Sequence, residues 1–302
     1  MIRSPRYSGG YSWKNYKESS VKPHSSQILP GLHIVATPIG NLGDITLRAL
    51  EVLKQADLIA CEDTRVSGKL LSHFGISKPT LSYNDHNADG RRPQLMQALE
   101  AGKTVALVSD AGTPLISDPG YKLVRDCVAA GIAVTTLPGP SSVMAALTLS
   151  GLPTDRFFFA GFLPAKEEAC RKEIQALATI PATLVLFESA RRLVDTLELM
   201  QKLMGSRQAA VVREITKLYE ETRRGSLQEL QEFYKKNGEP KGEVVMVIAP
   251  PEEKEASTGD VEEKLALLLK TMSVKEASSI VAEETGRPRK EVYTLALKLM
   301  QG

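Results

Sequence analysis

The chain has 302 residues, of which 42% are apolar and 25% are charged, as in an ordinary water-soluble globular protein. Its formal net charge of +2 excludes a polycation, so any nucleic-acid binding must come from local basic clusters. No apolar run reaches the roughly 18 residues that cross a bilayer. The three cysteines, Cys61, Cys127 and Cys170, are widely spaced, which argues against a disulfide scaffold and a zinc site. These features predict a cytoplasmic protein without a metal.

The N-terminal segment differs in composition from the rest of the chain. Five cations stand against the single acid Glu18, among serine, tyrosine and glycine residues: Arg3, Arg6, Lys14, Lys17 and Lys22. This composition predicts a disordered basic leader over residues 1–30. A transit peptide is also basic, serine-rich and poor in acids, and it remains an alternative.

Short apolar runs then alternate with helix-like stretches up to residue 150. Strands are expected over Leu32–Thr37, Leu58–Cys61, the region near Leu81, Thr104–Ser109 and Ile132–Leu137. The first helix is expected over Asp44–Gln55, with Asp44 as its N-cap. This rhythm predicts an α/β domain over residues 31–150, with a parallel sheet and helices on its faces. Binding loops in such sheets follow the carboxyl ends of the strands.

A second α/β domain is expected over residues 151–250. Its strands are expected at Arg156–Ala160, Ala182–Phe187, Gln208–Arg213, Lys217–Thr222 and Glu243–Ile248. Its helices are expected at Lys166–Ala178, Ala190–Met204 and Ser226–Lys236. Two successive strands around residues 208–222 predict a mixed sheet with an antiparallel part.

The remaining chain predicts a linker over residues 251–259 and a small helical module over residues 260–302. Within the module, a helix starting at Ser273, a turn at Glu283–Pro288 and a helix from Arg289 have helix-turn-helix spacing. A plain helical cap is the alternative interpretation. The cations that suit either phosphate contacts or an ordinary solvated face are Lys275, Arg287, Arg289 and Lys290.

Two loops stand out as ligand-binding candidates. Residues 37–44 join a strand to a helix, and their glycines allow a close approach of backbone to a ligand. The pattern is neither G-x-G-x-x-G nor a P-loop, so a dinucleotide or nucleoside triphosphate is not predicted. Residues 109–120 contain two aspartates, two glycines and two prolines, more than a structural turn needs. Asp110 or Thr113 would add a side-chain contact there.

Seven motifs in this order resemble the tetrapyrrole (corrin/porphyrin) methylase superfamily, and within it the branch that methylates 16S rRNA. They are Val35–Leu42, Cys61–Arg65, Leu107–Gly120, Leu137–Ser142, Gly161–Pro164, Phe187–Ser189 and Arg213–Lys217. The resemblance extends from Leu32 to about Ile248, and the helical tail looks like the C-terminal module of that branch. The leader lies outside it.

The resemblance implies two α/β domains with S-adenosylmethionine held in the cleft between them, and the loop Asp110–Ser117 as its main cradle. The donor-binding residues it implies are Thr37, Pro38, Gly40, Asp110, Gly112, Thr113, Ile116, Ser117, Ser141, Ser142 and Phe187. It further implies a homodimer. The implied reaction is methylation of the ribose 2′-hydroxyl of a decoding-centre cytidine, position 1402 of 16S rRNA, in the small ribosomal subunit.

Methyl transfer from a sulfonium is an in-line displacement, in which the protein mainly positions the partners. A ribose hydroxyl is a poor nucleophile, so a nearby base helps as its proton leaves. Glu62, Asp63 and Arg65 follow a strand and are the predicted catalytic set, facing ribose and phosphate. A structural ion pair involving Arg65 is the alternative. Other candidates for acid–base chemistry or phosphate binding are Asp85, His86, Arg91, Arg92, Glu188, Arg191, Arg192, Arg213, Glu214 and Lys217.

Two other functions remain open at this point. A relative of the same fold would methylate a porphyrin or corrin, and the strings Cys61–Arg65 and Arg213–Lys217, which resemble the RNA-directed branch, argue against it. A non-enzymatic RNA-binding protein would keep the fold and lose catalysis. The intact loop from Asp110 to Gly120 argues against that second alternative.

Overall fold

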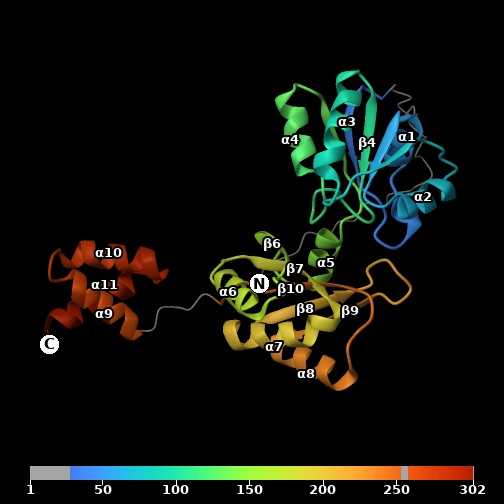
Figure 1. Cartoon of the computed structure of the whole chain (residues 1–302). Coiled ribbons are helices and arrows are strands. Elements are labelled where there is room, and N and C mark those ends of the chain that lie inside the picture. The colour runs from blue at the N-terminus through green and yellow to red at the C-terminus, as the bar shows by residue number, and fades with distance from the viewer. Residues whose placement is uncertain (1–27, 253–257, 302) are drawn as a thin grey trace, which may run out of the picture. The chain divides into compact units, whose positions relative to one another are not determined.

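The computed structural model describes residues 28–252 and 258–301 (Figure 1). Most of the predicted leader and residues 253–257 of the predicted linker lie outside the described residues. The chain divides into two compact units between Ser142 and Val143. The sequence analysis placed this division after residue 150. The structure instead groups nearly all of the helix that ends at Ser150 with the second unit.

The first unit contains a five-stranded sheet with the order β3-β2-β4-β1-β5, and all of its strand pairings are parallel. Its strands are β1 (Gly31–Val35), β2 (Leu58–Cys61), β3 (Thr80–Ser82), β4 (Thr104–Val108) and β5 (Val134–Leu137). Since every strand runs in the same direction, the loops that follow them all emerge at one edge of the sheet. The predicted parallel sheet is confirmed.

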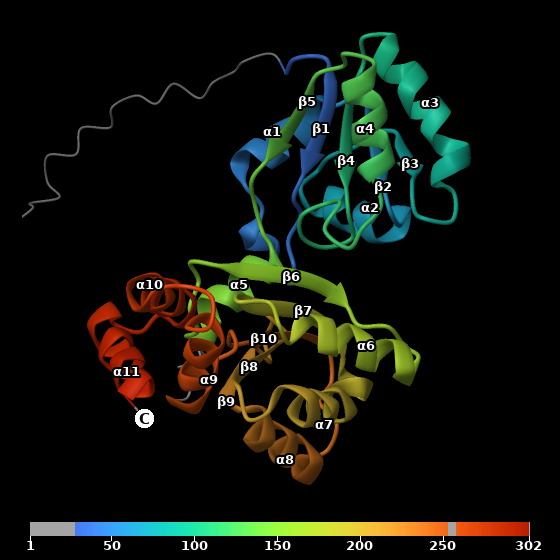
Figure 2. The same cartoon turned by 90° about the vertical axis from the view of Figure 1, so that its left-hand side faces the viewer.

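Helices cover both faces of this sheet (Figures 1 and 2). On one face, α1 (Leu47–Gln55) and α2 (Thr64–His73) pack against the strands; on the other, α3 (Ala88–Glu100) and α4 (Tyr121–Ala129) do so. The chain leaves β1 toward the first face and leaves the neighbouring strand β4 toward the second. Connections therefore diverge between β1 and β4, and such a switch point is where open α/β sheets bind ligands.

The segment after β1 differs from the prediction. Leu42–Asp44 forms a short 3₁₀ helix, and α1 begins only at Leu47. Thr46 is its N-cap, because its Oγ1 accepts a hydrogen bond from the N–H of Ala49 at 3.1 Å. The prediction of Asp44 as N-cap is therefore wrong. Threonine caps a helix nearly as well as aspartate. Asp44 belongs to the short 3₁₀ helix that precedes α1.

The second unit includes α5 (Ser142–Ser150) apart from its first residue, and it contains a second five-stranded sheet with the order β6-β7-β10-β8-β9. Its strands are β6 (Phe157–Phe162), β7 (Thr183–Ser189), β8 (Gln208–Arg213), β9 (Glu221–Ser226) and β10 (Glu243–Ile248). Only the β6–β7 pairing is parallel, which confirms the predicted mixed sheet. One face packs on α6 (Glu167–Leu177), α7 (Leu193–Met204) and α8 (Leu227–Asn237).

One predicted strand of this unit, Lys217–Thr222, starts too early and overlaps the observed strand only at Glu221 and Thr222. Residues 217–220 form part of a loop, and β9 begins at Glu221 rather than at Lys217. Just before the predicted strand, Glu214 and Thr216 have φ angles of 50° and 64°, in the left-handed region, so the chain is still turning there. The turn after β8 is therefore longer than the sequence pattern indicated.

The C-terminal module consists of α9 (Thr258–Leu268), α10 (Val274–Thr285) and α11 (Arg289–Gln301). The three helices share a small core of Val261, Leu265, Ala277, Val281, Val292 and Ala296. Ser273 and Glu276 form a capping box at the start of α10, and Gly286 ends that helix with a φ of 67°. The predicted helix–turn–helix spacing is thus present. None of the helices in the described parts has the length and apolar character that a membrane span requires.

Candidate functional site

Three loops meet at the carboxyl edge of the first sheet, beside the switch point. Thr37, after β1, forms a two-way backbone bridge with Gly112, after β4, with N–O distances of 2.9 and 3.0 Å. Thr113 Oγ1 donates to the carbonyl of Pro140, after β5, at 3.1 Å. The structure therefore brings together the loops that the sequence selected from three separate places in the chain.

The loop of residues 109–120 has an unusual backbone. Leu115 and Ser117 have φ angles of 74° and 64°, a region in which each residue other than glycine costs roughly 1–2 kcal/mol. Such strain persists where the surrounding contacts impose it, and it is common at ligand-binding sites. The buried Ser109 fixes the start of the loop, since its carbonyl accepts a hydrogen bond from Thr37 Oγ1 at 3.1 Å. Ile116 and Ser117 are exposed at its tip.

The predicted donor-binding residues of the first unit differ in what they offer a ligand. Thr37 and Pro38 are buried, so they form the base of the site. Gly40 is exposed, and Ser141 is half-buried. Gly112 has a φ of 84°, and a Cβ added there would lie 3.3 Å from the side chain of Ile39. The glycine therefore serves both the backbone conformation and the close packing of two loops.

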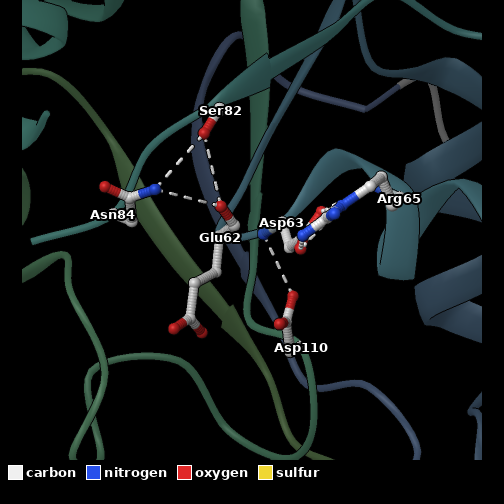
Figure 3. A network of polar contacts seen from close by, with 6 residues as sticks. All are labelled: Glu62, Asp63, Arg65, Ser82, Asn84 and Asp110. Carbon is white, nitrogen blue, oxygen red and sulfur yellow. Dashed lines mark hydrogen bonds and ion pairs between the residues drawn. The ribbon is translucent and has the colours of Figure 1, made fainter. Parts of the chain in front are cut away.

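The loops after β2, β3 and β4 are also joined. The N–H of Asp63 donates to Asp110 Oδ1 at 3.1 Å. The carbonyl of Glu62 accepts hydrogen bonds from Ser82 Oγ at 3.3 Å and from Asn84 Nδ2 at 3.5 Å (Figure 3). Asp110 thus orients the segment that carries the predicted catalytic residues, in addition to lying in the predicted donor loop.

Asp63 and Arg65 form an ion pair with each other. Asp63 is the N-cap of α2, and its Oδ2 lies 2.6 Å from a guanidinium nitrogen of Arg65. The hydrogen bonds from the side chain and backbone of Arg65 lower the pKa of Asp63 to about 2. A carboxylate with so low a pKa is a weak proton acceptor. The sequence analysis gave a structural ion pair of Arg65 as the alternative to a catalytic role, and the structure contains this ion pair.

Glu62 has different properties. Its carboxylate forms no ion pair among the described residues, and Figure 3 shows it directed away from Ser82 and Asn84. Burial, followed by the negative charge of Asp110, raises its pKa, against the lowering effect of a hydrogen bond with the backbone of Asp110. A carboxylate with a raised pKa accepts a proton more readily than an ordinary glutamate does. Among the three predicted catalytic residues, Glu62 best fits that role.

Sequence reasoning missed Asp118, the second aspartate of the 109–120 loop. Burial, followed by the charge of Glu62, raises the pKa of Asp118 to about 6, against the lowering effect of a hydrogen bond with Ser109. Burial also raises the pKa of Asp110. The repeated aspartate in a loop at a strand end was the available signal. Together, Glu62, Asp110 and Asp118 make this edge favourable for a positively charged ligand.

We expect Asp118→Asn to stabilise the protein at pH 7.5. The pKa of Asp118 lies above its ordinary value of 3.8, so stability is lost as pH rises from about 4 to about 6 and the group ionises. A shift of this size corresponds to roughly 3 kcal/mol, which solvent screening of the half-buried side chain reduces to about 1 kcal/mol. Thermal unfolding of both proteins should show a difference at pH 7.5 that disappears toward pH 4. An equal gap at both values would contradict this assignment.

Several predicted phosphate-binding arginines already have partners. Arg92 contacts Asp89 and Asp126, each at 2.8 Å, and so links α3 to α4. Arg192 donates to the carbonyls of Leu163 and Pro164. Arg91 and Arg191 are exposed, as are Asp85 and His86.

The candidates in the second unit are largely engaged in local contacts. Glu188 is buried, and its carboxylate accepts hydrogen bonds from Thr196 Oγ1 and the N–H of Ser189, both at 2.7 Å. Phe187 on β7 packs against Phe159 with ring centroids 5.0 Å apart. Arg213, Glu214 and Lys217 also form ion pairs. In the parts of the chain that the structure describes, no group of three or more His, Cys, Asp or Glu residues could hold a metal ion.

Comparison with known proteins decides the family. The model of the Tetrapyrrole (Corrin/Porphyrin) Methylases matches residues 31–231. The chain belongs to this methylase family. The model of the RsmI C-terminal HTH domain matches residues 255–300, which agrees with the three-helix module. The resemblance seen in the sequence and the predicted fold class are therefore confirmed, and the protein is a methyltransferase.

Two curated relatives of this methylase are named ribosomal RNA small subunit methyltransferase I. The protein of Mesorhizobium japonicum is 49% identical, over 89% of this chain and 92% of its own length. That of Escherichia coli O157:H7 is 45% identical, over 88% and 94% respectively. A solved uroporphyrin-III C-methyltransferase from Thermus thermophilus, complexed with S-adenosylhomocysteine, has a TM-score of 0.52 and 20% identity, covering 72% of this chain and 97% of its own. This last similarity concerns the fold alone.

Proposed function

We propose that this methylase transfers a methyl group from S-adenosylmethionine to the ribosomal RNA of the small subunit. The observation that carries the proposal is the name shared by relatives that are 49% and 45% identical and match along nearly their whole length. The matching C-terminal helix–turn–helix module supports it further. By the same resemblance, we propose a homodimer that acts in the cytoplasm, and a molar-mass measurement in solution tests the dimer.

The residues of the carboxyl edge fit the methyl donor. S-adenosylmethionine supplies an activated methyl group on a positively charged sulfur. Glu62, Asp110 and Asp118 supply negative charge at this edge, and the bridge between Thr37 and Gly112 holds the loop backbone for close contact. The proposed donor-binding residues are Thr37, Pro38, Gly40, Asp110, Gly112, Thr113, Ile116, Ser117, Ser141, Ser142 and, in the second unit, Phe187.

The proposed acceptor is the ribose 2′-hydroxyl of the decoding-centre cytidine. A hydroxyl must lose its proton as the methyl group arrives, and a positioned base accelerates such a step by roughly 10²- to 10⁴-fold. Glu62 is the proposed base, because its carboxylate forms no ion pair among the described residues, and because burial and the charge of Asp110 raise its pKa. The ion pair of Asp63 and Arg65 holds the start of α2 next to it.

The test is to incubate the purified protein with labelled S-adenosylmethionine and small ribosomal subunits that lack the modification. We expect label on one decoding-centre cytidine, at the ribose. Label on another rRNA nucleotide would retain the enzyme class and overturn the acceptor. Donor binding without labelled RNA would favour a porphyrin or corrin acceptor, and absence of donor binding would favour the non-enzymatic RNA-binding protein.

A further inference from the structure

The loop between β8 and β9, residues 214–220, is held in a strained conformation. Glu214 and Thr216 have φ angles of 50° and 64°, although neither is a glycine. Between them, Ile215 is only 7% exposed and anchors the loop in the second unit. Strain of this kind persists only where the surrounding contacts enforce it, and it often accompanies a functional role.

Glu214 supplies most of these contacts. Its N–H donates to the carbonyl of Glu243 at 3.1 Å. Its Oε1 accepts hydrogen bonds from the N–H of Glu243 at 3.0 Å and from Lys217 Nζ at 2.8 Å. A Cβ at Gly242 would overlap this carboxylate, so a glycine is required beside it. The base of the loop is therefore clamped to the start of β10.

The tip of the loop is fixed by its own backbone. The N–H of Lys217 donates to the carbonyl of Glu214 at 3.0 Å, and that of Glu220 donates to the carbonyl of Lys217 at 3.1 Å. The N–H of Thr216 donates to Glu220 Oε2 at 2.6 Å. On this rigid frame the side chains of Leu218 and Tyr219 are 88% and 70% exposed. Two large apolar side chains are thus exposed to solvent on a backbone that is already ordered. A ligand that binds them therefore does not have to order the loop.

The charges around the loop exclude a phosphate clamp. Arg213 contacts Glu221 at 2.9 Å, and Lys217 contacts both Glu214 at 2.8 Å and Glu243 at 3.1 Å. Both cations of the motif Arg213–Lys217 are therefore neutralised locally. What the loop offers is an aromatic ring beside an aliphatic side chain. Proteins commonly use such rings to stack unpaired bases of RNA, which are planar and apolar on their faces.

Leu218 and Tyr219 are by themselves too small a surface to form an interface with a second copy of the chain. A stable protein interface takes about 800 Å² from each partner. A tyrosine buries roughly 150–250 Å², and Leu218 adds less than that. The two side chains thus provide well under the area that a dimer needs, but enough for one base.

We propose that Tyr219 and Leu218 form a stacking platform for an unpaired base of the RNA substrate. This inference rests on the proposed function, which makes the substrate an RNA. The platform adds affinity that does not depend on phosphate contacts. It therefore contributes to holding the RNA and leaves donor binding and the chemical step unaffected.

The test compares Tyr219→Ala, Tyr219→Phe and Leu218→Ala with the full-length wild-type protein, using small subunits that lack the modification. Loss of one base stack costs roughly 1–3 kcal/mol, so Tyr219→Ala should raise KM for the subunits about 5- to 150-fold. Tyr219→Phe keeps the ring and should stay within about threefold, and Leu218→Ala should lie between the two. The value of kcat, the donor Kd and the salt dependence of RNA binding should match the wild type. Val128→Ala, an exposed truncation on α4, is the control.

A folded Tyr219→Ala protein with wild-type KM would overturn the platform. So would a variant whose loss of RNA binding accompanies a halved molar mass in solution, because Tyr219 would then serve a contact between copies. A variant that loses donor binding would point to a structural role instead. If the wild-type protein itself fails to label rRNA, the proposed function is wrong, and the stacking platform, which depends on it, is wrong as well.

Discussion

Replacing Gly112 with alanine should weaken S-adenosylmethionine binding by roughly 10- to 100-fold. The backbone at Gly112 has a φ of 84°, which alanine adopts only with strain, and the added Cβ would press on Ile39 at 3.3 Å. Relief of that strain must move a backbone that is bonded on both sides to Thr37. A misplacement of about 1 Å can cost a factor of about 10² in reaction rate, and we expect a loss of up to similar size in donor binding. Calorimetric titration with the donor measures the effect.

Gly131 provides a matched control for this substitution. It also has a positive φ, 70°, but it follows α4 and has nothing within 4 Å of an added Cβ. Gly131→Ala should therefore lose about the same stability, roughly 1 kcal/mol, and bind the donor normally. If Gly112→Ala folds and binds the donor as tightly as Gly131→Ala, the assignment of the loop as the donor cradle is wrong.

Replacing Glu62 with glutamine should lower kcat for RNA methylation by roughly 10²- to 10⁴-fold, the contribution of a general base. Glutamine preserves the size of the side chain and leaves the backbone carbonyl free to accept from Ser82 and Asn84. The donor Kd should rise far less than kcat falls, because Asp110 and Asp118 still supply negative charge at this edge. Single-turnover methylation of small subunits, at saturating donor, separates the chemical step from binding.

The pH profile distinguishes a base from a structural residue. Glu62 accepts a proton only when ionised, and its raised pKa moves the rise in rate to higher pH than for an ordinary glutamate. The wild-type rate should climb through this pKa, and the Glu62→Gln rate should lack that rise. Asp85→Asn removes a nearby exposed charge and should retain the wild-type profile apart from a small shift. An unchanged profile in Glu62→Gln would exclude Glu62 as the base.

The candidate loops could be predicted from the sequence because their signals are local. Apolar runs of four to six residues followed by glycine, proline or aspartate indicate strand ends, and a parallel sheet places all such ends at one edge. The role of each side chain could not be predicted in this way. Asp63 and Glu62 are neighbours in sequence, yet Asp63 forms an ion pair with Arg65 and Glu62 forms none among the described residues. The hydrogen bonds from Arg65 lower the pKa of Asp63, whereas burial and the charge of Asp110, which is distant in the chain, raise that of Glu62.

By itself, the sequence determined the fold class, the helical module and the family, because periodicity and short motifs are properties of neighbouring residues. Only the tertiary structure decided the strand order β3-β2-β4-β1-β5, the bridge between Thr37 and Gly112, and the hydrogen bond from Asp63 to Asp110. The predicted strand at Lys217 failed for the same reason. Its residues suit a strand locally, but the clamp of Glu214 on β10 holds the chain in a turn. Contacts between distant segments set these features, and local preference is too weak to fix them.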